Sequence, residues 1–117
     1  MVKILKQYFP EQWARQERAY QRVRHFMKTR KILQDKPWLD FGGAFFAVAV
    51  KEGNSEIYHL DWSDDREALT WVTGLGTWKG GDLRLVELDV QVPMKEGEAL
   101  CGCMRQLVHS GSPIVSG

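Results

Sequence analysis

The sequence predicts a mostly β protein of the α+β class, in which an amphipathic helix precedes a β-sandwich or small barrel. Residues 11–36 contain no Gly or Pro and repeat apolar side chains at helical spacing. Residues 37–117 instead alternate short apolar runs with Gly-rich turns, a pattern typical of strands in a sandwich or barrel. We therefore expect an N-terminal basic helix in residues 1–36 and a β domain in residues 37–117.

The helix is expected within residues 10–33. Pro10 suits the first helical turn, and the Glu11 carboxylate is favourable near the positive end of the helix dipole. The side chains that recur at helical spacing and predict a buried stripe are Trp13, Tyr20, Val23 and Met27. Pro37 ends the segment.

Charge is distributed unevenly along the chain. Residues 1–36 hold ten Lys or Arg and three Asp or Glu, whereas residues 37–117 hold six basic and twelve acidic residues. A second helical stripe is formed by Arg15, Arg18 and Arg22. This asymmetry indicates either a nucleic-acid contact through the basic helix or a solvated helix face paired with the acidic half.

Several short segments of the second part are expected to be strands. Residues 44–50 are apolar and bounded by glycines, which predicts a buried strand. The other expected strands are residues 56–62, 68–75, 82–88, 90–93, 99–104, 107–109 and 114–115. Residues 95–98 read Lys-Glu-Gly-Glu and predict a turn.

The composition also bears on the compartment. The longest apolar run, residues 41–50, is far shorter than the roughly 18 to 20 residues of a membrane-spanning helix. The N-terminus lacks the apolar region and cleavage site of a signal peptide. Cys101 and Cys103 are too close in sequence for good disulfide geometry, which indicates reduced thiols. We expect an intracellular protein, nuclear or cytoplasmic, with no membrane contact.

Two of the three histidines are candidate metal ligands. His59 and Asp61 are separated by one residue, so on a strand they face the same way and can bind one ion. His109 follows much later in the chain. His25 lies among basic residues of the helix and is interpreted as a surface or packing histidine.

Other segments accompany these ligands in a characteristic order. Gly80-Gly81-Asp82-Leu83 follows the His59-Leu60-Asp61 segment, and a Pro93-to-Gly97 turn then leads toward His109. Together with the apolar residues 41–50, this order resembles the Fe(II)/2-oxoglutarate dioxygenases, and most closely the TET/JBP-like dioxygenases of fungal genomes.

The resemblance implies a double-stranded β-helix, the jelly-roll core also found in cupins, in which His59, Asp61 and His109 bind Fe(II). It implies hydroxylation of a C–H bond coupled to decarboxylation of 2-oxoglutarate. In TET/JBP relatives that bond belongs to the 5-methyl group of a pyrimidine in nucleic acid. A base that leaves the stack needs a planar partner, and the candidates are Trp62, Trp71 and Trp78, with strand packing as the alternative for each.

The sequence departs from this family after its second histidine. In the family, an Arg or Lys on the next strand holds the distal carboxylate of 2-oxoglutarate. Residues 110–117 contain no basic residue, so we expect a core that is incomplete at its C-terminus and a truncated or weakly active enzyme. Arg84 and Arg105 are candidate substitutes for cosubstrate binding.

Two other interpretations stay open. His59 and His109 belong to the residue types that bind zinc, and so do Cys101 and Cys103. Alternatively, the chain is a catalytically inactive jelly-roll module that contacts nucleic acid or protein through its basic helix.

Overall fold

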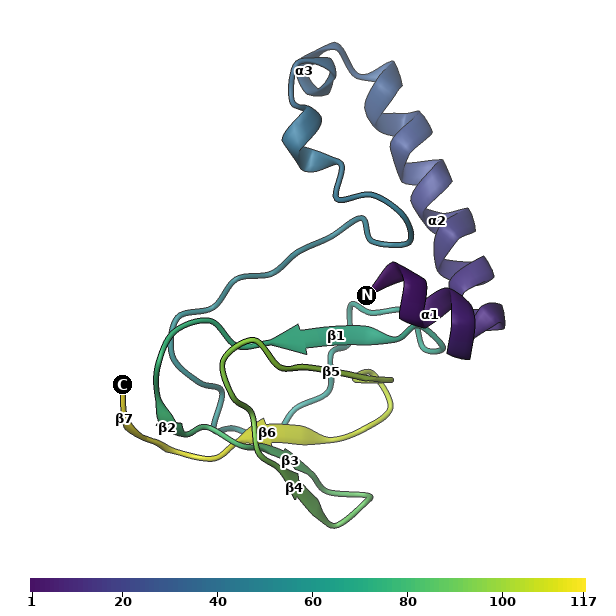
Figure 1. The fold of residues 1–117 in the computed structure, drawn as a ribbon. Coiled ribbons are helices and arrows are strands. Elements are labelled where there is room, and N and C mark those ends of the chain that lie inside the picture. Colours follow the sequence, from purple (N-terminus) through teal and green to yellow (C-terminus); the bar gives the residue numbers. More distant parts are fainter. The chain divides into compact units, whose positions relative to one another are not determined.

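The computed structural model describes residues 1–117, which form two compact units, Met1–Val50 and Lys51–Gly117 (Figure 1). The helices belong to the first unit and the strands to the second. The fold is therefore mixed α+β, as the sequence predicts, with small antiparallel sheets and no closed barrel. None of the helices combines the length and apolar character that crossing a bilayer requires.

The N-terminal unit is built around one long helix. Its elements are α1 (Val2–Tyr8), α2 (Pro10–Thr29), α3 (Lys31–Gln34) and the 3₁₀ helix η1 (Pro37–Leu39). Helix α2 confirms the predicted helix and has Pro10 at its first position. It ends before residue 33 because Arg30 is extended, with φ −104° and ψ 107°. The sequence does not predict α1, in which only Leu5 is buried and the apolar periodicity is short.

After α3 and η1 the chain returns alongside α2, and Asp40 binds this returning segment to α2. The Asp40 carboxylate accepts hydrogen bonds from the Tyr20 hydroxyl at 2.5 Å and from the Gly42 amide at 3.1 Å. Arg24 Nε lies 3.2 Å from the other carboxylate oxygen. The hydrogen bond from Tyr20 lowers the pKa of Asp40, and the same bond raises the pKa of Tyr20. Tyr20, a buried residue of the predicted apolar stripe, thus also holds the returning segment through its hydroxyl group.

The predicted buried strand at residues 44–50 is wrong. This segment joins no sheet and is largely exposed, with Val48 at 62% and Val50 at 92% of full accessibility. Apolar composition shows that a segment favours burial, but a strand also requires a neighbour to satisfy its backbone groups. No strand of the structure pairs with residues 44–50.

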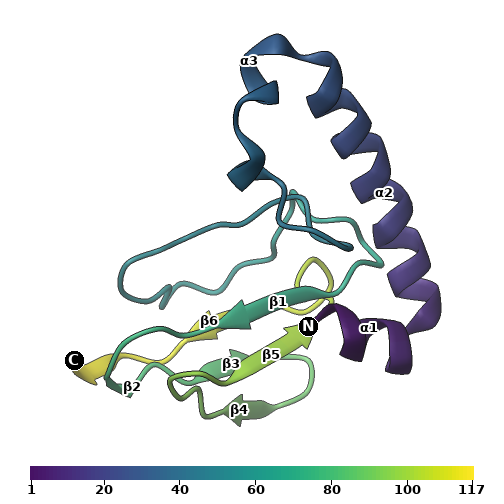
Figure 2. The ribbon, with the colours of Figure 1, turned by 45° about the horizontal axis from the view of Figure 1, so that its top comes forward.

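The C-terminal unit contains three small antiparallel sheets (Figures 1 and 2). One pairs β1 (Thr70–Thr73) with β5 (Ala99–Gly102), and another pairs β2 (Lys79–Gly80) with β7 (Ile114–Ser116). In the third sheet, β3 (Leu83–Leu85) lies between β4 (Val90–Val92) and β6 (His109–Gly111). Strands β1, β3, β4, β5 and β7 confirm five predicted segments, whereas β6 overlaps the predicted strand 107–109 only at His109, and the sequence does not predict β2. Gly97, with φ 77°, forms the predicted turn before β5.

The apolar core joins two of these sheets. Leu83 and Leu85 alternate with the less buried Arg84 on β3, so both leucines face the same side. They pack with the fully buried Met104, and the partly buried side chains around this cluster include Val72 of β1 and Leu100 of β5. His109 pairs directly with Leu85, which places its side chain on the core face of the sheet.

Replacing Tyr20 by Phe is expected to lower the midpoint of thermal unfolding by about 2–5 °C, because the hydrogen bond to Asp40 is lost. The Asp40 contribution is present above its ordinary pKa of 3.8 and disappears as the pH falls through its lowered folded value. The Tyr20 contribution is present below pH 10.0 and disappears as the pH rises through its raised folded value.

The midpoints of thermal unfolding of the unchanged protein and of Tyr20→Phe should therefore differ by a constant amount between about pH 5 and pH 9. The two midpoints should converge at more acidic and at more alkaline pH. The exposed Tyr8 supplies the matched control, since Tyr8→Phe removes the same atom without a structural partner. An effect of Tyr20→Phe no larger than that of Tyr8→Phe would contradict the prediction.

Candidate metal centre

The centre is organised by a backbone pair between residues 50 positions apart. The His59 amide donates to the His109 carbonyl at 3.0 Å, and the His109 amide donates back to the His59 carbonyl at 3.0 Å. Residues paired in this way project their side chains to the same face. The two imidazole rings accordingly lie together, with their centroids 4.3 Å apart.

This bridge is all that remains of the predicted strand at residues 56–62, which otherwise runs as turns and irregular backbone. Next to it, the Gly111 amide donates to the Ser55 carbonyl at 2.6 Å, and the Asn54 amide group donates to the Ser112 carbonyl. A Cβ at Gly111 would lie 1.8 Å from Asn54 Oδ1. A side chain at position 111 would therefore displace the Asn54 amide group from its hydrogen bond to Ser112, a contact that sequence analysis did not find.

Asp61 completes the cluster from the loop that follows the bridge. Its amide donates to the Met104 carbonyl at 3.1 Å, which ties the loop to the turn after β5. Its Oδ1 lies 3.6 Å from His59 Nε2 and 3.7 Å from His109 Nε2. The candidate ligand atoms of His59, Asp61 and His109, termed here the metal triad, all lie within 4.8 Å of one another.

Both histidines are held in the tautomer that binds metal. His59 Nδ1 lies 2.8 Å from the Ile57 carbonyl oxygen, and His109 Nδ1 lies 2.8 Å from the Leu107 carbonyl oxygen. A carbonyl oxygen can only accept, so each Nδ1 carries the hydrogen. The neutral ring then has its free electron pair on Nε2, the atom that faces Asp61. A hydrogen bond from the ring nitrogen that does not bind the metal to a carbonyl oxygen is typical of histidines that bind metal ions.

The triad is closed on one side and open on the other. The His109 side chain is 7% exposed, whereas those of His59 and Asp61 are 37% and 34% exposed. Three protein ligands with solvent access leave coordination positions for exogenous molecules, as in catalytic rather than structural sites. With bonds near 2.1 Å, adjacent ligand atoms of an octahedral ion stand about 3.0 Å apart, so the His–Asp separations of 3.6 and 3.7 Å would shorten when the triad binds one ion.

Arg105 supports the loop that carries Asp61. Its Nη1 donates to the Trp62 carbonyl at 2.6 Å and to the Asp64 carbonyl at 2.8 Å. The neighbouring Gln106 Nε2 donates to the Arg66 carbonyl at 2.5 Å. The turn after β5 therefore holds residues 61–66 at several points, and the Arg105 guanidinium is engaged in this support.

Arg84 lies on the other face of its sheet. On β3 it alternates with Leu85, the residue paired with His109, and it pairs with Ser110 instead. The structure therefore brings together the three predicted metal ligands. A contact of Arg84 or Arg105 with 2-oxoglutarate stays a prediction.

The zinc interpretation with two cysteine ligands is wrong for this structure. Neither Cys101 nor Cys103 belongs to the ligand cluster, and both are free thiols. Burial, followed by the neighbouring Cys103, raises the pKa of the Cys101 thiol, which disfavours the thiolate that zinc requires. The two cysteines were assigned to the site by residue type alone, and the fold separates them from it.

The three candidate tryptophans have different environments. Trp71 lies on β1 opposite Cys101, and the Trp78 ring packs so closely over Gly74 that a Cβ there would lie 2.3 Å from it. Trp62 follows Asp61 and is 70% exposed. Strand packing therefore accounts for Trp71 and Trp78, whereas Trp62 is an exposed aromatic residue that follows Asp61 in the chain.

No protein-family model matches this chain, and comparison with curated proteins and with solved structures gives no match. The capacity of the triad to bind a metal ion therefore rests on its geometry.

The metal triad should bind one Mn(II) or Fe(II) ion, and His59→Ala, Asp61→Ala or His109→Ala should each weaken binding by at least about 100-fold, because two ligands seldom retain a first-row ion. Titration calorimetry with Mn(II) measures this directly. His25→Ala is the matched control, since His25 lies on α2 outside the triad. Undiminished affinity in His59→Ala would refute the assignment.

Replacement of Arg105 by Gln should lower Mn(II) affinity by about tenfold, because the Asp61 loop loses its support while the ligands remain. Arg66→Gln removes the same charge from the supported loop and should leave the affinity unchanged, since only the Arg66 carbonyl is used. Unchanged metal affinity in Arg105→Gln would contradict the positioning role.

Proposed function

We propose that this chain is an Fe(II)/2-oxoglutarate dioxygenase-like protein whose metal triad holds the iron. The observation that carries the proposal is the triad itself, which presents two Nε2 atoms and one carboxylate oxygen toward a common point. Two histidines and one carboxylate, with open positions beside them, form the ligand set of non-haem Fe(II) oxygenases.

The arrangement of the strands supports a double-stranded β-helix as the underlying fold. The core face of the β4–β3–β6 sheet packs toward β1 and β5 through Leu83, Leu85 and Met104. His109 projects from that same face. A metal ligand that points inward between two small antiparallel sheets is what a jelly-roll dioxygenase requires.

Bound Fe(II) would supply oxygen activation coupled to the conversion of 2-oxoglutarate and O₂ into succinate and CO₂, with one oxygen atom inserted into a substrate C–H bond. The chain's own residues prepare the site for this chemistry. His109 anchors the ion from the buried side, and the exposed edges of His59 and Asp61 leave access for the cosubstrate. One carboxylate and two neutral imidazoles leave a positive charge on a divalent ion, which attracts the anionic 2-oxoglutarate.

The proposed substrate is a nucleic acid carrying a methylated pyrimidine. Trp62 supports this choice, because it follows Asp61 in the chain and its exposed indole is available to stack on a base that has left its helix. Arg105 already donates its Nη1 to two carbonyls, and Arg84 lies on the opposite face of the sheet from His109, so neither arginine is arranged in this structure as a dedicated partner for the distal carboxylate of 2-oxoglutarate. We therefore propose a weakly active enzyme.

The second candidate function is a binding module without turnover, which contacts nucleic acid or protein through the N-terminal helix. The exposure of its arginine stripe favours it, since Arg15, Arg18 and Arg22 all reach the surface of α2. Such a module would use the metal triad for structure alone.

The protein loaded with Fe(II) should bind 2-oxoglutarate and release succinate slowly, and Asp61→Ala should abolish both. Anaerobic titration that follows the iron-to-cosubstrate charge-transfer absorption measures binding, and product analysis measures turnover. Arg105→Lys, which keeps the charge, reports whether this arginine also contributes to cosubstrate affinity. Normal metal binding without any 2-oxoglutarate binding would refute the dioxygenase proposal and favour the binding module.

A further inference from the structure

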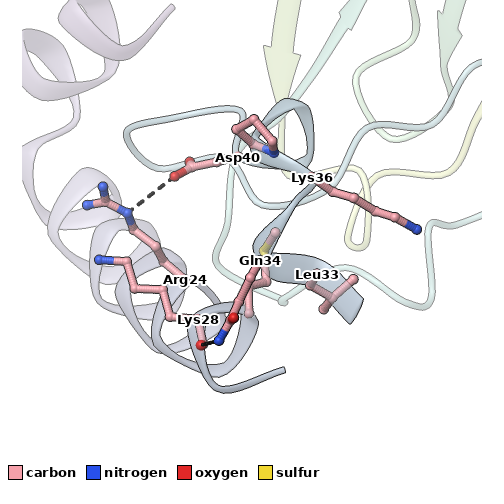
Figure 3. Close-up of a pocket in the computed structure, with 8 residues that line it drawn as sticks. Arg24, Lys28, Leu33, Gln34, Lys36 and Asp40 are labelled. Atoms are coloured by element: carbon pink, nitrogen blue, oxygen red, sulfur yellow. Dashed lines mark hydrogen bonds and ion pairs between the residues drawn. The ribbon is translucent and has the colours of Figure 1, made fainter. Parts of the chain in front are cut away.

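The N-terminal unit contains a surface pocket of about 380 Å³ that the proposed metal chemistry does not involve. It lies between the second half of α2 and the returning segment that includes α3 and η1 (Figure 3). Its apolar wall is formed by Met27, Leu33 and Pro37. Its polar lining is formed by Arg24, Lys28, Gln34, Lys36 and Asp40.

Arg24 is held in position at this pocket. Its Nε lies 3.2 Å from Asp40 Oδ2, and Asp40 is itself held by the Tyr20 hydroxyl and the Gly42 amide. A guanidinium has five N–H donors, so an interaction through Nε leaves its terminal groups available to a ligand. The side chain is 45% exposed, which keeps those groups accessible.

Lys28 places a second positive charge beside the first. It follows Arg24 by one helical turn, and the two side chains extend from the same face of α2 (Figure 3). Asp40 is the sole carboxylate among the lining residues and is already engaged with Arg24. The two like charges repel each other, and an anion between them would relieve that repulsion.

The opposite wall of the pocket is also fixed. Gln34 Nε2 donates to the Lys28 carbonyl at 2.8 Å, which ties α3 to the end of α2. The pocket thus combines a positioned guanidinium, a lysine one helical turn away and an apolar wall, the combination expected for an anion carried on an organic body. Lys36 extends away from the cationic pair and is assigned no contact (Figure 3).

We propose that this pocket binds an organic phosphate, with the phosphate group between Arg24 and Lys28 and the organic body against Met27, Leu33 and Pro37. Arg and Lys are the usual partners of phosphate oxygens, and a positioned guanidinium loses little freedom on binding. The excess of ten basic over three acidic residues in residues 1–36 attracts anions to this unit.

Titration calorimetry of the full chain with adenosine monophosphate tests the proposal. Arg24→Gln and Lys28→Gln should each weaken binding by about tenfold, as expected for loss of one charge-assisted contact. Lys3→Gln and Lys31→Gln remove the same charge from exposed positions of this unit outside the pocket and should leave the affinity within about twofold. Equal weakening by all four variants would show unspecific charge attraction and overturn the proposal.

Further arms of the titration identify the ligand class. Inorganic phosphate should bind about tenfold more weakly than adenosine monophosphate, because it makes no use of the apolar wall. Equal affinities would overturn the assignment of an organic body. Binding of a single-stranded oligonucleotide without binding of adenosine monophosphate would overturn the proposal in favour of a nucleic-acid contact. Lys28→Gln keeps the test valid if loss of the Asp40 contact unfolds Arg24→Gln.

Discussion

The reciprocal backbone hydrogen bonds between His59 and His109 are the interaction on which the C-terminal unit's chemistry depends. They join a segment that otherwise has little regular structure to the edge of the β4–β3–β6 sheet. They also place two imidazoles on one face, where Asp61 can reach both. A residue larger than Gly111 would meet the Asn54 amide group, which donates to the Ser112 carbonyl close to this pair.

Both backbone carbonyls and one side chain hold the residues of the triad in place. The carbonyls of Ile57 and Leu107 select the tautomer of each histidine, and the Met104 carbonyl fixes the amide of Asp61. Arg105 then holds the loop beyond Asp61 through two further carbonyls. Through these contacts Arg105 ties the turn after β5 to the loop that carries Asp61.

The N-terminal unit uses charge in a different way. Asp40 receives three polar contacts, from Tyr20, Arg24 and Gly42, and so organises the returning segment around one carboxylate. The arginine that it holds is also a wall of the pocket. The carboxylate that organises the returning segment therefore also positions an arginine that lines the pocket.

By itself, the sequence determined the local features that depend on neighbouring residues. Helix α2 follows from its apolar spacing and from Pro10 at its start, and most strands follow from short apolar runs between glycines. The one-residue separation of His59 and Asp61 indicates a shared metal ion, because ligand type and local spacing can be read directly from the sequence.

Only the tertiary structure decided which distant residues meet. Residues 44–50 are apolar enough for a strand, yet no other strand forms backbone hydrogen bonds with them. Cys101 and Cys103 have suitable chemistry but lie outside the cluster, and Arg105 supports a loop because its turn packs against residues 61–66. Pairing partners, side-chain direction and burial arise from long-range packing, which a local pattern does not contain.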